Sequence, residues 1–127
     1  MARDVSSKIR INRLAIKRLE TAQIRALRKT ADFLHGEIAD AQVIPMETGA
    51  LSGEQFFVQD NKASEGHAEL VNATPYARRL YFHPEYNFSK TYHADAQGEW
   101  FDPWVDGSKK NVAENAYRRF YKEESGV

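Results

Sequence analysis

The sequence predicts an α+β protein: a long basic N-terminal helix packed on a small antiparallel sheet, then an aromatic-rich loop and a C-terminal helix. Three observations predict this class. Apolar residues recur at helical spacing in two separate segments, two short β-type segments lie between them, and an irregular aromatic segment precedes the second helix. The 127 residues suit a single domain, residues 1–127, because two domains would each approach the lower size limit for independent folding.

The first helix is predicted over residues 12–40. Asn12 is a candidate N-cap, and Gly36 weakens the last turns and favours an early end. Residues 1–11 are expected to form an arm or a short strand, because Ile9 and Ile11 alternate with charged residues. The apolar residues of the helix lie three and four positions apart: Ala15, Ile16, Leu19, Ala22, Ala26, Leu27, Ala31, Leu34 and Ile38.

Residues 43–82 are predicted to hold a tight turn followed by the sheet. The structural turn is expected at Glu47, Thr48 and Gly49, where Gly49 adopts a positive φ and the polar side chains hydrogen-bond the turn. This is an ordinary structural role rather than a catalytic one.

Two strands are predicted after this turn, at 55–59 and 67–72, joined as a hairpin through the polar segment 60–66. Residues 76–82 fit either a third strand or a helical turn, since Pro75 permits both.

The aromatic loop is predicted over residues 83–104. Nine of the 15 aromatic residues of the chain lie within residues 76–104, a density that is not typical of a disordered linker. These rings either pack over the sheet or face a partner. Trp100 and Trp104 are expected in the core, and Tyr86, Phe88 and Tyr92 are expected to form contacts with other molecules.

The C-terminal helix is predicted over residues 108–122, with Ser108 as the N-cap and Gly126 just past the end. Its apolar stripe contains Val112, Ala116 and Phe120, spaced four residues apart.

The charge of the chain is unevenly distributed. Residues 1–30 hold nine of the 18 basic residues and two acidic ones, a net charge of +7, so residues 31–127 carry −7. The basic residues either solvate the outer face of the first helix or contact another copy of the chain or a polyanion. A small nucleic-acid-binding protein that uses this helix for phosphate contacts is therefore one functional alternative.

No motif indicates catalysis. The chain has no Cys, which excludes disulfides and thiol chemistry, and it lacks the HExxH, P-loop, GxGxxG and GxSxG patterns. His83, His93 and Asp95 fall in one loop, but their spacing matches no known metal-ligand pattern. We therefore expect no enzyme activity, metal or cofactor. No membrane association is expected either, because no apolar run approaches the roughly 18 residues of a membrane span.

Several motifs resemble those of one group of virion proteins. Residues 45–52 (PMETGALS) are similar to a Pro-x-Asp-Thr-Gly-x-Leu-Arg motif of the tail-completion family, with Glu47 in place of Asp and Ser52 in place of Arg. Residues 74–81 (TPYARRLY), 87–90 (NFSK) and 98–104 (GEWFDPW) are similar in order and spacing to the minor capsid, or head–tail connector, family of long-tailed bacteriophages and prophages. The resemblance covers the chain from about residue 10.

The resemblance implies a structural virion protein of the phage neck. It would form a homo-oligomeric ring between the portal and the tail, assembled in the bacterial host cytoplasm, with neighbouring neck and tail proteins as partners. DNA passing through the ring would make incidental, non-specific contacts. The side chains expected at subunit or partner interfaces are Arg18, Arg25, Arg78, Arg79, Tyr86, Phe88 and Tyr92. If residues 76–82 form a strand, Arg78 and Arg79 point to opposite faces.

Overall fold

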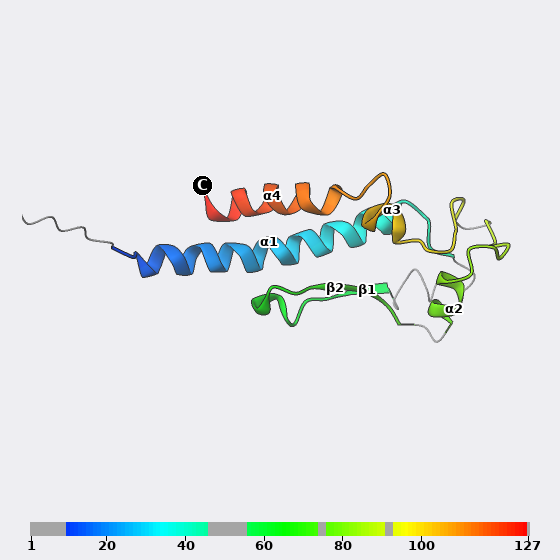
Figure 1. The fold of residues 1–127 in the computed structure, drawn as a ribbon, viewed down its shortest axis with the longest axis horizontal. Coiled ribbons are helices and arrows are strands. Elements are labelled where there is room, and N and C mark those ends of the chain that lie inside the picture. The colour runs from blue at the N-terminus through cyan, green and yellow to red at the C-terminus, as the bar shows by residue number, and fades with distance from the viewer. Residues whose placement is uncertain (1–9, 46–55, 74–75, 91–92, 127) are drawn as a thin grey trace, which may run out of the picture.

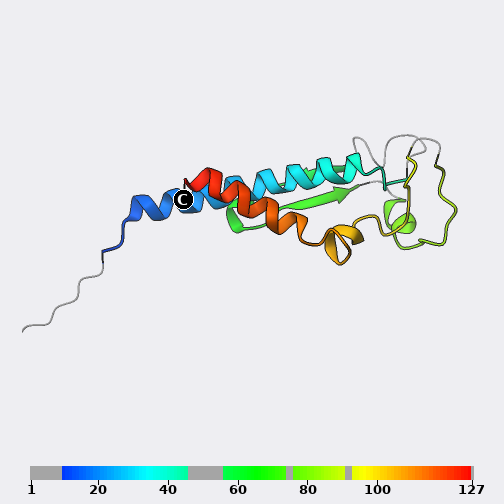
Figure 2. The ribbon, with the colours of Figure 1, turned by 90° about the horizontal axis from the view of Figure 1, so that it is seen from above.

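A computed structural model describes residues 10–45, 56–73, 76–90 and 93–126. The molecule is elongated, and its axis is the long helix α1, Arg13–Asp40 (Figures 1 and 2). Helix α4, Val112–Ser125, runs along one side of α1. A hairpin of β1, Phe56–Gln59, and β2, Glu69–Asn72, runs along the other side (Figure 1). This arrangement confirms the predicted α+β class.

Helix α1 begins as the sequence indicates. The side-chain oxygen of Asn12 accepts a hydrogen bond of 3.1 Å from the amide of Ala15 and so caps the first turn. The helix continues through Gly36 to Asp40, which confirms the predicted end at residue 40; packing of the last turns against the core outweighs the weak helix propensity of one glycine. It stops after Asp40, where Gln42 adopts a left-handed φ of 55°, a conformation that glycine usually supplies after a helix.

The two strands pair antiparallel, with Phe57 opposite Val71. They are joined through a 3₁₀ turn, Ala63–Glu65, and Gly66 takes a φ of 81° that favours glycine. The hairpin expected at 55–72 is thus confirmed, with β2 shorter than predicted. Phe56 is buried against α1 and Phe57 is exposed, as alternation along a strand requires.

Residues 76–82 form helix α2, Ala77–Tyr81, so the alternative of a third strand is wrong. Consequently Arg78 and Arg79 do not point to opposite faces of a sheet. Residues 10–12 form no strand, so no part of the expected short strand lies in the described residues. Ile9 lies outside the described residues, as do Glu47, Thr48 and Gly49 of the expected turn.

The C-terminal helix starts later than predicted. A short helix α3, Asp102–Val105, interrupts the aromatic loop, and its carbonyl at Asp102 accepts hydrogen bonds from the amides of Asp106 and Gly107. The amide of Lys109 donates a hydrogen bond to the carbonyl of Pro103, and this bond keeps the chain in turns beyond Ser108. Ser108 is therefore not the N-cap. The predicted end is close, since Gly126 caps α4 with a φ of 72°.

The main core lies where α1 ends. Ile38, Ile44, Phe56, Trp100 and Trp104 are all buried there, from α1, β1, α3 and the connecting segments. Trp104 donates a long hydrogen bond of 3.4 Å from its indole N–H to Glu37 of α1. The prediction that Trp100 and Trp104 are core residues is thus confirmed.

A second, thinner contact joins α1 to α4 through small side chains. Ala22 and Ala26 of α1 and Ala116 of α4 are buried in it. The rings of Phe33 and Phe120 meet edge to face, with centroids 6.2 Å apart. Because α4 has 14 residues and α1 has 28, the N-terminal turns of α1 are left without a covering helix (Figures 1 and 2).

Candidate interface surfaces

The N-terminal end of α1 extends beyond α4 and the hairpin (Figures 1 and 2). We call residues 10–18 the overhang; every one of them is exposed. Large apolar side chains stand among them, with Leu14 at 81% and Ile11 at 67% exposure. The overhang holds four basic residues and no acidic one: Arg10, Arg13, Lys17 and Arg18.

The basic residues nearer the middle of α1 are paired within the subunit. The carboxylate of Glu124 in α4 forms ion pairs with Lys29 at 2.5 Å and with Arg25 at 3.6 Å. Arg28 forms a separate ion pair with Asp60 at 3.7 Å. The hydrogen bond from Lys29, together with the charges of Lys29 and Arg25, lowers the pKa of the Glu124 carboxyl. Of the two α1 residues predicted at an interface, Arg25 is thus engaged in its own subunit, whereas Arg18 has no ion pair among the described residues.

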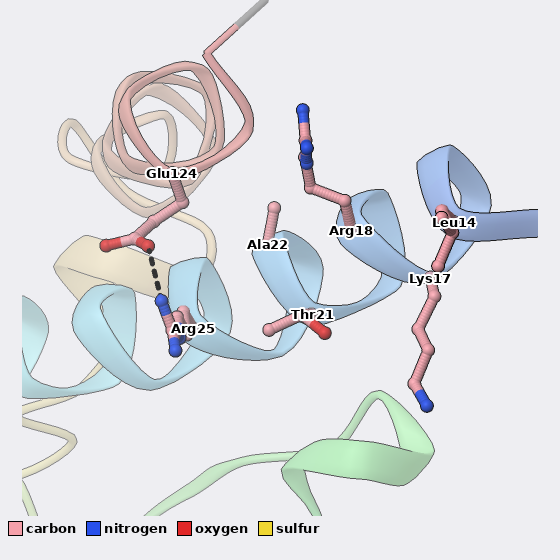
Figure 3. A pocket seen from close by; sticks show the side chains of 7 residues that line it. All are labelled: Leu14, Lys17, Arg18, Thr21, Ala22, Arg25 and Glu124. Carbon is pink, nitrogen blue, oxygen red and sulfur yellow. Dashed lines mark ion pairs between the residues drawn. The ribbon is translucent and has the colours of Figure 1, made fainter.

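A shallow pocket of about 240 Å³ marks the place where α4 stops covering α1 (Figure 3). In Figure 3 Ala22 points toward α4, while the Arg18 side chain rises beside the end of α4 without reaching Glu124. The lining side chains come from the overhang, the next turns of α1 and the last turn of α4: Leu14, Lys17, Arg18, Thr21, Ala22, Arg25 and Glu124.

The opposite end of the molecule carries the other predicted interface residues. The Arg79 guanidinium lies 5.9 Å from the Tyr86 ring centroid and donates to the Tyr86 hydroxyl at 3.4 Å, which raises the pKa of Arg79. Phe88 stands 6.4 Å from Tyr86, and both rings are half-buried. The structure therefore brings Arg79, Tyr86 and Phe88 into one cluster. Tyr92 lies outside the described residues.

Arg78 belongs to a neighbouring apolar surface. Its guanidinium lies 6.0 Å from the ring centroid of Phe82, which is 62% exposed. Beside them the Tyr81 hydroxyl donates to Asp102 at 3.0 Å. Burial, together with that hydrogen bond, raises the pKa of Tyr81 to about 12.

Sequence reasoning missed Ile11, Leu14 and Phe82 as exposed apolar residues. One signal for the first two was available: the predicted helices differ greatly in length, so part of the longer one must lack a partner. Phe82 follows α2 directly, and an apolar residue there gives no sign of whether it faces the core.

The histidines serve structural contacts or surface pairs. His93 donates a hydrogen bond to the carbonyl of Ile44 at 2.7 Å. His83 pairs with Glu85 at 2.8 Å, and this hydrogen bond lowers the pKa of Glu85.

Across the described ranges, no three His, Asp or Glu side chains gather closely enough to hold a metal ion. Within those same ranges, no helix has both the length and the apolar character that a membrane crossing requires.

No protein-family model, curated protein or solved structure matches the chain.

Proposed function

We propose that the protein is a structural component of the neck of a long-tailed bacteriophage or prophage, where a ring of copies joins the portal and head connector to the tail. The observation that carries the proposal is the exposure of large apolar side chains at both ends of an elongated molecule. Leu14 is 81% exposed at one end, and Phe82 and Val105 are 62% and 72% exposed in the region of the other. A ring subunit needs two different contact surfaces, and exposed apolar groups are typical of such surfaces.

The motif that resembles the minor capsid family most specifically also has a clear physical role. Within residues 98–104, Trp100 and Trp104 are core residues, and a Cβ at Gly98 would lie 2.6 Å from the Cα of Pro84. Such packing constraints favour fixed residue types at fixed spacing, as expected of a motif that defines a fold family. The order of helix, hairpin, aromatic segment and helix also agrees with that resemblance.

The proposed partners are other copies of the chain and the neck and tail proteins on either side of the ring. The test is deletion of the gene from its phage or prophage, followed by electron microscopy of the particles. Filled heads that lack tails are expected, with complementation by the intact gene. Normal tailed particles from the deletion strain would contradict the proposal.

Purified protein provides a second test. Size-exclusion chromatography with light scattering, with and without the neighbouring neck proteins, should show an assembly larger than one subunit when the neighbours are present. A protein that stays monomeric and binds none of the neck and tail proteins would argue against the ring.

A nucleic-acid-binding function is the alternative, and one observation favours it: the four cations of the overhang have no ion pair among the described residues. Such a surface would bind duplex DNA without sequence preference. Contacts to four phosphates give a slope of log K against log salt of roughly −3.6. Fluorescence anisotropy with a labelled duplex at several salt concentrations measures that slope, and Arg13→Glu together with Arg18→Glu should abolish it. Tight DNA binding without any self-association would favour this alternative over the ring.

A further inference from the structure

The overhang continues a face of α1 that is already a helix-packing surface. Ala15 lies on the same side of the helix as Ala22 and Ala26, at spacings of seven and four residues, and Ile11 lies just before the N-cap residue Asn12. Ala22 and Ala26 are buried, at 2% and 0% exposure, while Ala15 is exposed and Ile11 is 67% exposed. The overhang is thus a packing surface for which the subunit supplies no partner.

The exposed apolar residues favour a protein over a polyanion as the occupant. Phosphates offer hydrogen-bond acceptors and charge but no apolar surface, so Ile11 and Leu14 would stay in water beside bound DNA. A protein surface that is both acidic and apolar would satisfy the cations and bury these side chains at once.

Charge repulsion opposes a symmetric contact between two overhangs, because each would bring Arg10, Arg13, Lys17 and Arg18 against the same residues of the other copy. An acidic occupant is therefore favoured. Within the chain, residues 31–75 contain eight acidic residues and one Lys, a net charge of −7, whereas residues 76–127 hold eight of each sign. Six of these eight acidic residues lie in the described residues, three in the second half of α1 and three in the hairpin: Asp32, Glu37, Asp40, Asp60, Glu65 and Glu69.

The outer face of the hairpin combines the two required properties. Phe57, Gln59, Glu69 and Val71 share this face through strand alternation and the pairing of Phe57 with Val71 and Gln59 with Glu69. Phe57 is 38% exposed, and Glu69 and the nearby Glu65 are exposed. Asp60 is already paired with Arg28, and one carboxylate oxygen of Glu69 lies 2.6 Å from the His67 ring. Glu65, which has no ion pair among the described residues, and the second carboxylate oxygen of Glu69 are therefore the groups toward which a cationic partner is directed.

We propose that the overhang of one copy docks on the outer hairpin face of a second copy, with Leu14 against Phe57 and the overhang cations against Glu65 and Glu69. The contact joins two different surfaces of the same chain, so it leaves each copy able to bind a further neighbour. The inference rests on the proposed ring and names the subunit contact within it.

Site-directed cross-linking tests this contact, because the chain has no Cys of its own. A Leu14→Cys variant is mixed with a Phe57→Cys variant and treated with a short bismaleimide, and the adduct is measured on denaturing gels. The matched control replaces Phe57→Cys with Val105→Cys, at a side chain that is 72% exposed in a different region. Circular dichroism establishes that each variant keeps the helical content of the parent protein.

The expected result is a Leu14–Phe57 adduct in several-fold excess over both the Leu14–Val105 and the Leu14–Leu14 adducts. The excess should shrink between about 0.01 M and about 1 M salt, across which the Debye length falls from about 30 Å to about 3 Å. Equal yields for the pairs, a dominant Leu14–Leu14 product or no adduct would each overturn the proposal.

A charge exchange separates this contact from the wider function. Reversal of the overhang, Arg13→Glu with Arg18→Glu, should lower the adduct yield several-fold. Adding Glu65→Lys with Glu69→Lys to the partner variant should restore it. Unchanged yields with the reversed overhang would refute the contact, whereas the ring itself would still be judged by particle assembly in the deletion strain. If the reversed overhang loses duplex binding but not cross-linking, its occupant is a polyanion and the proposal fails.

Discussion

The indole N–H of Trp100 donates a hydrogen bond of 2.8 Å to the side-chain oxygen of Asn72, and this contact ties the aromatic segment to the end of strand β2. Trp100 is 1% exposed, so the donor is out of reach of bulk water. Tyr81 and Phe101 pack against the same indole, with ring centroids 4.9 and 6.2 Å away. The hydrogen bond therefore fixes the position of Trp100, against which Tyr81 and Phe101 pack.

Replacing Asn72 by Ala should destabilise the protein by about 1–3 kcal/mol, because a buried donor is left without its acceptor. Urea unfolding followed by tryptophan fluorescence measures the change. Gln59→Ala, at an exposed position of the same hairpin, is the control and should stay within about 0.5 kcal/mol. Equal stability of the two variants would show that the Trp100 bond contributes nothing.

Two glycines should respond to alanine in opposite directions. Gly36 lies inside α1, and a Cβ added there would meet no atom within 4 Å, so Gly36→Ala should stabilise the protein by about 0.5–1 kcal/mol. Gly98→Ala should destabilise it, since the new Cβ would lie 2.6 Å from the backbone of Pro84. The melting temperatures of both variants are compared with that of the parent protein. A higher melting temperature for Gly98→Ala would show that the contact between Gly98 and Pro84 leaves room for a side chain.

Alkaline pH should weaken the fold through Tyr81. Its pKa is raised to about 12 in the folded protein, against about 10 for an unfolded tyrosine. The folded state therefore holds the phenolic proton longer, and the stability gained from it is complete below pH 10 and lost as the pH rises toward 12. Unfolding free energies measured across this range should fall less steeply for Tyr81→Phe than for the parent. If the unfolding free energies of the two proteins fall equally steeply with pH, the loss of stability is caused by a group other than Tyr81.

Acid should weaken the α1–α4 contact through Glu124. Its lowered pKa means that the folded state releases the proton more readily than the unfolded chain, in which a Glu pKa is about 4.3. The resulting stability is present above that value and is lost as the pH falls through the lower folded pKa. Glu124→Gln should flatten the dependence of the urea midpoint on pH in this acidic window. Glu123→Gln, at an exposed neighbouring position, serves as the control and should keep the slope of the parent.

Arg18 and Arg25 should not be equivalent. Arg18→Glu should leave the unfolding midpoint nearly unchanged, because Arg18 has no ion pair in the described part of the chain. Arg25→Glu should lower it, because Arg25 lies 3.6 Å from Glu124 and the reversal sets two carboxylates against each other. Measuring both midpoints at low salt and at high salt checks the cause, since screening should reduce the Arg25 effect. A larger loss for Arg18→Glu would contradict this division of the basic face.

The fold was largely predictable where local signals agree with packing. Asn12 caps α1 because its side chain satisfies a free amide, and the alternation at Phe56 and Phe57 matches one buried and one exposed face. The start of α4 was not predictable from Ser108, because the turns there are held by carbonyls of Asp102 and Pro103, which no local pattern at Ser108 reveals.

The candidate surfaces were predictable in part. The basic character of α1 is evident in the sequence. Arg79 and Tyr86 were each expected at an interface, but their clustering depends on the helical form of α2 and the turn from His83 to Tyr86, which the sequence left open. Which basic residues of α1 form ion pairs depends on the positions of Glu124 and Asp60, which come from distant parts of the chain. The periodicity of α1 does not indicate where these carboxylates lie.

Because residues 13–18 of the overhang belong to the same uninterrupted helix as the core residues of α1, each subunit fixes the angle at which it presents its N-terminal turns. Each residue added to or removed from α1 between Arg18 and Ala22 would rotate the overhang by about 100° and shift it by about 1.5 Å. If neighbours dock on the overhang, that rotation would be passed to the next copy and repeated at every step. The helical phase between these two residues would then decide whether successive copies close on themselves or wind into an open spiral.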